Sequence, residues 1–426
     1  MFSVITLAVE LVIKAFLNEL TLGSGKTEAI DIAFIGLFSL AFMYDIGHSK
    51  RLKEFSTPLF LGYIFRVALL FFDIYGRNIY LLPNSGADSE MFYGNIVQYA
   101  RTGSSRRSGN FITVMGTIFH YIGTSRLYGQ FIILLFSMVS LILFCRLLQK
   151  VEIDGRVRNT VCMVVCLLPN LAILSSIFLR ESIVAMFITI SFYLFYKWLN
   201  GQSIMYFVLA FISAFCASAF HSGSAAVAVG YIAIVLLYDR HSKKFRFRGR
   251  NLIPAILLIA VVAFLYINYS GELFGKMNNI DEISDIATGN GLGGSSYARY
   301  VGNSSNPLNM IIYTPLRIVF FLFSPFPWQW RGLSDIIAFV FSSLFFLYTA
   351  WCNIRFLRSG EKKNRTLVIA LTIVAVCTAF VFAWGVSNTG TACRHRDKMA
   401  IIWGFVLALT YHTKANKLSG VESNNA

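Results

Sequence analysis

Long apolar runs alternate with short polar segments along the whole chain. The runs are continuous and do not alternate residue by residue, which indicates helices and argues against a membrane β-barrel. Because a helix needs roughly 17 to 25 residues to cross a hydrocarbon core about 30 Å thick, we predict an all-α, polytopic integral membrane protein with about 11–12 transmembrane helices. Eleven expected spans are residues 30–44, 59–74, 127–148, 160–179, 182–199, 205–220, 225–238, 252–267, 335–351, 367–384 and 399–411.

Two further apolar segments do not fit this count simply. The run 310–323 is interrupted by Pro315 and followed at once by Pro325 and Pro327, so we expect a re-entrant or peripheral outer helix that is sheltered by protein. Residues 2–22 form an otherwise apolar helix with a narrow polar stripe, and they would be a twelfth span. The stripe consists of Thr6, Glu10, Lys14 and Asn18.

The charge of the chain follows the membrane pattern. Of 426 residues, 56% are hydrophobic and only 14% are charged, yet the net charge is +16. This excess lies in short loops between apolar runs, as the positive-inside rule predicts for cytoplasmic loops, and not in a basic patch suited to nucleic acid. We therefore expect no nucleic-acid partner and a cytoplasmic position for residues 48–55, 146–158, 240–250, 355–365 and the tail 412–426.

The seven cysteines predict neither a disulfide framework nor a metal site. Six of them lie within or at the ends of apolar runs, and the chain contains no C-x-x-C pair and no cluster of cysteine and histidine. We accordingly expect no metal and no cofactor.

The opposite side of the membrane collects most of the unusual polar residues. It receives a first outer loop at 75–126 with short amphipathic helices and a second at 270–332 that includes the re-entrant segment, on one predicted transmembrane domain of residues 1–426. Acids, arginines and histidines from distant parts of the chain converge there: Asp88, Glu90, Arg101, Arg106, Arg107, Arg180, Glu181, His221, Arg299, Arg394, His395 and Arg396.

Arginines on the outward side oppose the positive-inside rule, so they require a compensating anion. Phosphate is the best candidate, because the guanidinium fork binds two phosphate oxygens at once and stays charged when partly buried. Asp88 and Glu90 stand two residues apart in the first outer loop. One of these carboxylates could act as a general base while the other orients a hydroxyl or its partner.

Several motifs on this side resemble those of one known family, in the same order along the chain. They are the acidic pair of ADSEMFYG, the segment LPNLAILSSIFLRES, the SPFPW piece and the closing GTACRHRDK. From about Asp88 to Lys398 the chain is similar to bacterial polysaccharide polymerases of the Wzy and EpsG type.

The resemblance implies a GT-C-like membrane glycosyltransferase in the bacterial cytoplasmic membrane. Such an enzyme joins undecaprenyl-diphosphate-linked oligosaccharide repeats into O-antigen, capsule or exopolysaccharide on the extracytoplasmic side, without a cofactor. Its partners would be the lipid-linked oligosaccharide, membrane lipid and a chain-length regulator. On this chain, catalysis would fall to Glu90, Asp88 and Glu181, and binding of the diphosphate or sugar to Arg394, Arg396, Arg180, His221, His395, Arg299 and Arg101.

Each candidate residue also has a plain structural explanation. The acidic pair and Arg106 with Arg107 could be ordinary loop charge. Arg180 and Glu181 could find other partners that close a tight outer turn, His221 could pack between two helices, and Trp328 with Trp330 could form an interfacial aromatic belt.

Other functions stay open as well. A transporter or flippase for lipid-linked oligosaccharide, another GT-C glycosyltransferase that uses a polyprenyl-phosphate sugar, and a membrane O-acetyltransferase are the alternatives. Charges inside the predicted spans are few, mainly Arg66, Asp73 and Arg317, which favours an enzyme over a transport path.

Overall fold

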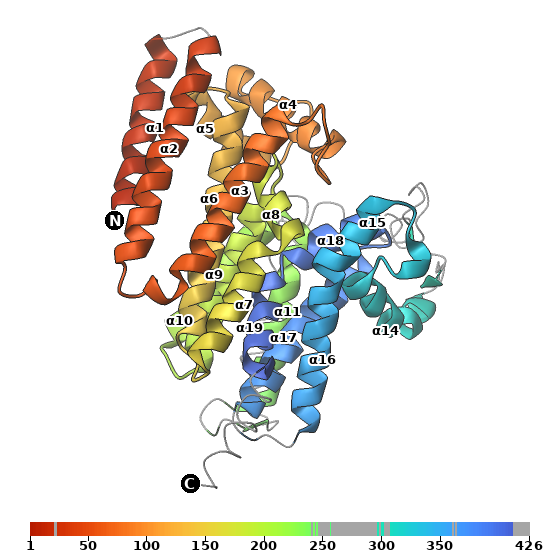
Figure 1. Ribbon diagram of the computed structural model, residues 1–426. Helices are drawn as coiled ribbons and strands as arrows, with labels where there is room; N and C mark the ends of the chain where they lie inside the picture. The colour runs from red at the N-terminus through yellow and green to blue at the C-terminus, as the bar shows by residue number, and fades with distance from the viewer. Residues whose placement is uncertain are drawn as a thin grey trace. The chain divides into compact units, whose positions relative to one another are not determined.

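The regular structure of the described residues is almost entirely helical, which confirms the predicted all-α class (Figure 1). The computed structural model describes residues 1–20, 24–239, 242, 244–245, 256, 296–297, 300–301, 307–359, 362 and 364–411. A two-residue antiparallel ribbon, β1 (Tyr238–Asp239) with β2 (Lys244–Phe245), lies at the start of a predicted cytoplasmic loop.

The chain divides into two compact units. Unit 1 comprises Met1–Arg146 and Cys162–Ile183, and unit 2 comprises Leu147–Val161 and Val184–Ala426. The prediction of one transmembrane domain over residues 1–426 stays a prediction. Helices wholly within unit 1 are α1 (Phe2–Leu20), α2 (Ser24–His48), α3 (Ser56–Tyr75), α4 (Ala87–Thr102), α5 (Asn110–Ile122) and α8 (Pro169–Ser176). Helices wholly within unit 2 are α10 (Ile204–Phe220), α11 (Ala226–Leu237), α14 (Pro307–Phe323), α15 (Leu333–Ala338), α16 (Leu344–Arg358), α17 (Arg365–Trp384), α18 (Thr389–Asp397) and α19 (Ala400–Tyr411).

Three helices contribute residues to both units: α6 (Arg126–Leu148), α7 (Gly155–Leu167) and α9 (Glu181–Leu199). Short 3₁₀ turns are found at Lys53–Phe55, Ser222–Ala225 and Pro327–Gln329. A π-helical turn at Phe339–Ser343 joins α15 to α16.

Among the described residues, six helices are long and apolar enough to cross a membrane, which supports a polytopic membrane protein. They are Thr27–His48, Lys53–Tyr75, Arg126–Leu148, Glu181–Leu199, Leu333–Arg358 and Arg365–Trp384. Shorter apolar helices at Ile204–Phe220, Ser222–Leu237, Ile312–Phe323 and Ala400–Tyr411 fall below the usual spanning length. The predicted span 252–267 lies outside the described residues, apart from Ile256. The count of eleven or twelve spans therefore stays a prediction.

The expected span 160–179 is bent rather than straight. Helix α7 ends at Leu167 and α8 begins at Pro169, with an angle of 49° between them. Leu168 takes an extended backbone, as the residue before a proline prefers, because the proline ring crowds a helical conformation there. The pair counts as a seventh span if it is one broken helix.

Pro315 behaves differently from its prediction. Helix α14 runs through it from Pro307 to Phe323, so the proline does not interrupt the run. The chain stops being helical just afterwards, at Ser324, where Pro325 and Pro327 follow. Whether this segment is re-entrant stays a prediction.

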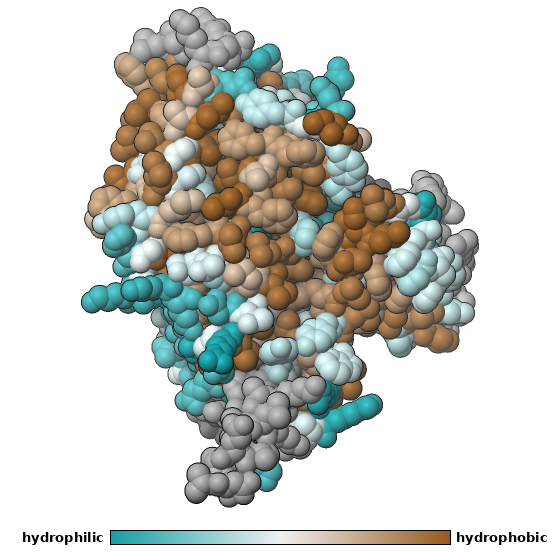
Figure 2. Space-filling view, in the orientation of Figure 1, coloured by the Kyte–Doolittle hydropathy of each residue, from teal (hydrophilic) through white to brown (hydrophobic). Residues whose placement is uncertain are grey.

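Close helix packing in unit 1 brings α3 against α7 and α8. A Cβ added to Gly62 of α3 would lie only 2.9 Å from Cβ of Cys166 in α7. Helix α1 packs on α2 and α5, and α4 packs on α5. In Figure 2 apolar side chains dominate the visible face of unit 1. Helices α2 and α3 carry exposed apolar residues such as Leu40, Leu61 and Ile64, as expected of a surface that contacts lipid.

Unit 2 encloses its last helix. Every residue of α19 from Ala400 to Thr410 is buried, which fits a helix that is apolar on all sides. Helices α16 and α17 pack on it, and Phe405 contacts Phe192 of α9 edge to face at 5.8 Å between ring centres. Helix α17 also packs on α11, where a Cβ on Gly230 would lie 2.8 Å from Cα of Val374.

The two ends of α3 carry different loops, which gives a test of membrane sidedness. The basic turn at 49–55 precedes α3 and the 76–86 loop follows it, and 20 helical residues separate these ends by about 30 Å. We expect Asn78→Cys, at an exposed position of the 76–86 loop, to react with a membrane-impermeant maleimide in intact cells and Lys50→Cys to react only after the membrane is opened. Wild-type protein controls for its own cysteines. The opposite labelling pattern would remove the basis for an outward site.

Candidate functional site

Helix α4 places the acidic pair of the first outer loop in its first turn. Asp88 and Glu90 lie there, where the unpaired N–H groups of a helix favour negative charge. The helix ends before Gly103, whose φ of +71° is the left-handed conformation that favours glycine at this position. Arg101 lies in the last turn, so one short helix carries predicted residues at both of its ends.

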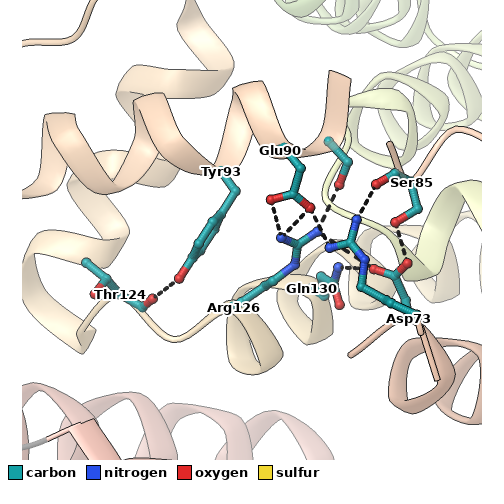
Figure 3. A network of polar contacts seen from close by, with 9 residues as sticks. Asp73, Ser85, Glu90, Tyr93, Thr124, Arg126 and Gln130 are labelled. Carbon is teal, nitrogen blue, oxygen red and sulfur yellow. Dashed lines mark hydrogen bonds and ion pairs between the residues drawn. The ribbon is translucent and has the colours of Figure 1, made fainter. Parts of the chain in front are cut away.

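Glu90 binds two arginines from different segments of unit 1 (Figure 3). Arg126, the first residue of α6, donates from Nη1 to its carboxylate at 2.8 Å, and Arg77, in the loop after α3, donates to Oε1. Arg77 also donates from Nη2 to the carbonyl of Ser85 at 2.6 Å. One carboxylate thereby joins α4, α6 and the 76–86 loop.

Asp73 forms the buried part of the same network. It is fully buried in the last turns of α3 and accepts hydrogen bonds from Oγ of Ser85 and, at 2.8 Å, from Nε2 of Gln130 (Figure 3). Nη2 of Arg126 lies 3.9 Å from its carboxylate. A buried carboxylate is costly unless it is paired and hydrogen-bonded, so these contacts explain how α3 keeps an acid near its end.

The surroundings of Glu90 decide what its carboxylate can do. Partial burial raises the pKa of Glu90, but the hydrogen bonds and charges of Arg77 and Arg126 outweigh it, so the net pKa lies below the ordinary value. Glu90 is therefore ionised and weakly basic at neutral pH, whereas an efficient general base has a pKa near the working pH. The geometry favours a positioning role for Glu90 over the role of base.

A cavity of about 770 Å³ lies within unit 1 beside this network. Arg77, Arg126 and Tyr93 line it, as does Arg101 from the other end of α4. The guanidinium of Arg126 lies 5.2 Å from the ring centre of Tyr93, whose hydroxyl donates to the carbonyl of Thr124 at 2.8 Å (Figure 3). The network therefore forms part of the wall of a space large enough for a small ligand.

Two other predicted residues of unit 1, Asp88 and Arg180, lie on or against α4. Asp88 is exposed on its first turn. Arg180 lies with its guanidinium 5.6 Å from the ring centre of Phe92, and Glu181 begins α9 with only 2% of its surface exposed. Burial makes Glu181 less accessible to a substrate than Asp88.

In unit 2 the structure brings together two histidines that are far apart in the sequence. The rings of His221, after α10, and His395, in α18, lie 4.5 Å apart between centres. Nζ of Lys398 lies 3.0 Å from Nδ1 of His395, and Phe382 stacks on the same ring at 5.5 Å. Arg394 is half-buried beside them in sequence.

Arg396 has a different environment from its neighbour Arg394. It is fully buried, and its Nη1 donates to the carbonyls of Ser324 at 2.5 Å and Leu322 at 3.1 Å, where α14 ends. Nε donates to Oγ of Ser342 at 2.9 Å, and Nη2 to Oγ of Ser343 at 3.0 Å. All three guanidinium nitrogens are thus engaged within unit 2. This geometry favours a structural role over the predicted contact with a diphosphate.

The structure does not describe one predicted residue, Arg299, and it contains site residues that were not predicted. Arg299 lies outside the described residues, although Tyr297 donates from its backbone N–H to the carbonyl of Ser387 at 2.8 Å, so that segment reaches the 385–398 region. Sequence reasoning did not assign site roles to Asp73, Arg77 or Arg126. Polar residues within apolar runs, such as Asp73, are the signal that could have found the network.

No protein-family model, curated protein or solved structure matches the chain.

Proposed function

We propose that the protein is a membrane glycosyltransferase of the polysaccharide-polymerase type, with a GT-C-like architecture. It joins undecaprenyl-diphosphate-linked oligosaccharide repeats into a surface polysaccharide on the extracytoplasmic side of the bacterial cytoplasmic membrane. The observation that carries the proposal is the network of Arg77, Glu90 and Arg126 at the end of α3 opposite the basic turn, whose two arginines line a large cavity. Fixed guanidinium groups at such a place suit a lipid-linked diphosphate.

The proposed reaction needs a stabilised leaving group and a base. The acceptor sugar hydroxyl attacks the anomeric carbon of the donor, the bond from that carbon to the diphosphate oxygen breaks, and the diphosphate departs on its lipid. Arg77 and Arg126 stabilise the charge that develops on the leaving oxygen. The hydroxyl proton passes to a carboxylate, for which exposed Asp88 is our candidate, because Glu90 is committed to the arginines.

Transport of the same lipid-linked oligosaccharide is the alternative function. A transport path would require ionisable groups that face a passage through the bilayer. Three buried charged groups within candidate spans of unit 1 are instead bonded to protein: Asp31 to Lys14, Asp73 to Ser85 and Gln130, and Arg66 to the carbonyls of Gly62 and Cys166. This pairing favours the enzyme, including the variant that uses a polyprenyl-phosphate sugar.

A reconstituted assay separates these functions. We expect purified protein in liposomes to convert the lipid-linked repeat, extracted from cells that lack this protein, into a ladder of longer chains and to release one undecaprenyl diphosphate per bond formed. Arg126→Gln should lose this activity, and Arg106→Gln, an exposed arginine in the same outer loop, should keep it. Movement of the repeat between leaflets without any ladder would replace the enzyme proposal by the transporter.

A further inference from the structure

We propose that the cavity of unit 1 binds the phosphate-bearing head group of a lipid. The proposal deepens the proposed function and rests on it, because it says where the lipid-linked donor is held. The sequence expectation assigned the diphosphate or sugar to Arg394, Arg396, Arg180, His221, His395, Arg299 and Arg101. Of these, Arg101 lines this cavity, whereas Arg394 and Arg396 lie in unit 2.

The lining of the cavity has an excess of positive charge. Four cationic side chains, Lys14, Arg77, Arg101 and Arg126, border it, and Glu28 is the one carboxylate among its described lining residues. The carboxylates that balance three of these cations do not line the cavity. Lys14 pairs with fully buried Asp31, and the network arginines pair with Glu90 and Asp73, so these acids hold the cations in place from outside the lining.

Arg101 is the cation that this internal pairing does not balance. Within the described part of the chain, no ion pair involves Arg101, whereas Lys14 and Arg77 each have one and Arg126 has two. Its charge, at the last turn of α4, is therefore available to an anion in the cavity. His120 lies on the same wall and is held by a contact of 2.9 Å between Nδ1 and the carbonyl of Ala100.

Part of the remaining lining is apolar, which distinguishes a lipid from a soluble phosphate. Ile30, Ile74, Phe119, Ile122 and Leu127 border the same space as the cations. Ile30 and Ile74 belong to candidate spans, so the apolar lining is continuous with helices that contact lipid. A phosphate group on an aliphatic chain satisfies both parts of the wall, and a volume of about 770 Å³ is within the usual range for a ligand of this kind.

Binding to the intact protein in detergent tests the site with defined probes. Farnesyl diphosphate should bind at least about tenfold more tightly than farnesol, which lacks the charge, and than inorganic pyrophosphate, which lacks the chain. Arg101→Gln should weaken farnesyl diphosphate binding about tenfold, the effect of losing one charged hydrogen bond. Arg106→Gln is the matched control, because this exposed arginine follows α4 but does not line the cavity.

The outcomes separate the site from the function. Unchanged binding by Arg101→Gln and by the charge reversal Arg101→Glu, both eluting as folded protein, would overturn the cavity assignment while leaving polymer formation to its own assay. Displacement of farnesyl diphosphate by phosphatidylglycerol at equal concentration would support the phosphate-lipid site and identify a membrane phospholipid as its occupant. Selective retention of the diphosphate against phosphatidylglycerol would support the lipid-linked donor.

Discussion

Polymer formation is expected to fall about a hundredfold when Glu90 is replaced by glutamine, the usual scale for disturbing one stabilising group of a leaving anion. The amide keeps the size of the side chain but removes the charge that holds Arg77 and Arg126 in place. Its NH₂ group would also face two guanidinium groups, donor against donor. The arginines should then lose the geometry that the diphosphate requires.

Steady-state kinetics show whether Glu90 positions the arginines or removes a proton. A positioning role predicts that KM for the donor rises together with the fall in kcat, because donor binding and transition-state binding both depend on the arginines. A base would lower kcat with little effect on KM. Glu152→Gln, at an exposed acid of the 146–158 loop, is the control. Wild-type rates for Glu90→Gln would contradict both roles.

The pH dependence of the reaction gives an independent check on Glu90. Because its pKa is lowered on folding, its ion pairs stabilise the folded state above the ordinary glutamate pKa of 4.5, and this stabilisation is lost as pH falls through the lower folded value. If the reaction rate falls as the pH is lowered through the neutral range, this acid limb of the pH–rate profile must therefore come from a group other than Glu90. Such a limb should persist in whatever activity Glu90→Gln retains, and its disappearance there would contradict this assignment.

Loss of folded protein is the expected result of replacing Arg396 with methionine. The substitution removes a fully buried guanidinium that donates to the carbonyls of Leu322 and Ser324 and to the hydroxyls of Ser342 and Ser343. Of these acceptors, the carbonyl of Ser324 keeps the hydrogen bond from Oγ of Ser343. Each buried acceptor that loses its donor costs about 1–3 kcal/mol, so losing several such donations together is a large part of the stability of most domains. Lysine should rescue little, because it cannot reach these acceptors with a planar fork.

Thermal unfolding of the purified chain in detergent measures this effect. Arg394→Met is the matched control, since Arg394 is half-buried two residues away and should change the midpoint far less. A wild-type midpoint for Arg396→Met, accompanied by loss of diphosphate binding, would restore the interpretation of Arg396 as a ligand-binding residue.

The helical class could be predicted from the sequence because long apolar runs indicate segments surrounded by lipid, where the backbone must satisfy its own hydrogen bonds. The bend between α7 and α8 could also have been predicted, because Pro169 lies inside the apolar run 160–179. The continuity of α14 through Pro315 could not be predicted from the sequence, because a proline within a helix is tolerated where surrounding groups satisfy the backbone hydrogen bonds.

The candidate site was harder to predict because its contacts are long-range. Glu90 meets residues 13 positions before it and 36 positions after it, and no local pattern records such pairs. Arg394 and Arg396 illustrate the same limit: they look equivalent in the motif, yet one is half-buried and the other fully buried. Which arginine turns inward depends on where α14 ends, and that information comes from another part of the chain.

The contacts of Arg66 bear on how the chain enters the membrane during synthesis. Its guanidinium donates to Oγ of Ser137 at 3.2 Å and to the carbonyl of Cys166 at 2.6 Å, and these partners lie 71 and 100 residues later in the sequence. Asp73 of the same helix accepts from Gln130, which lies 57 residues after Asp73. Each such charge costs about 2.5–3.5 kcal/mol at the centre of a lone helix in lipid. The ribosome finishes α3 well before α6 and α7 exist. The free energy of transferring α3 into the bilayer therefore becomes fully favourable only when these later helices have left the insertion machinery and pack beside α3.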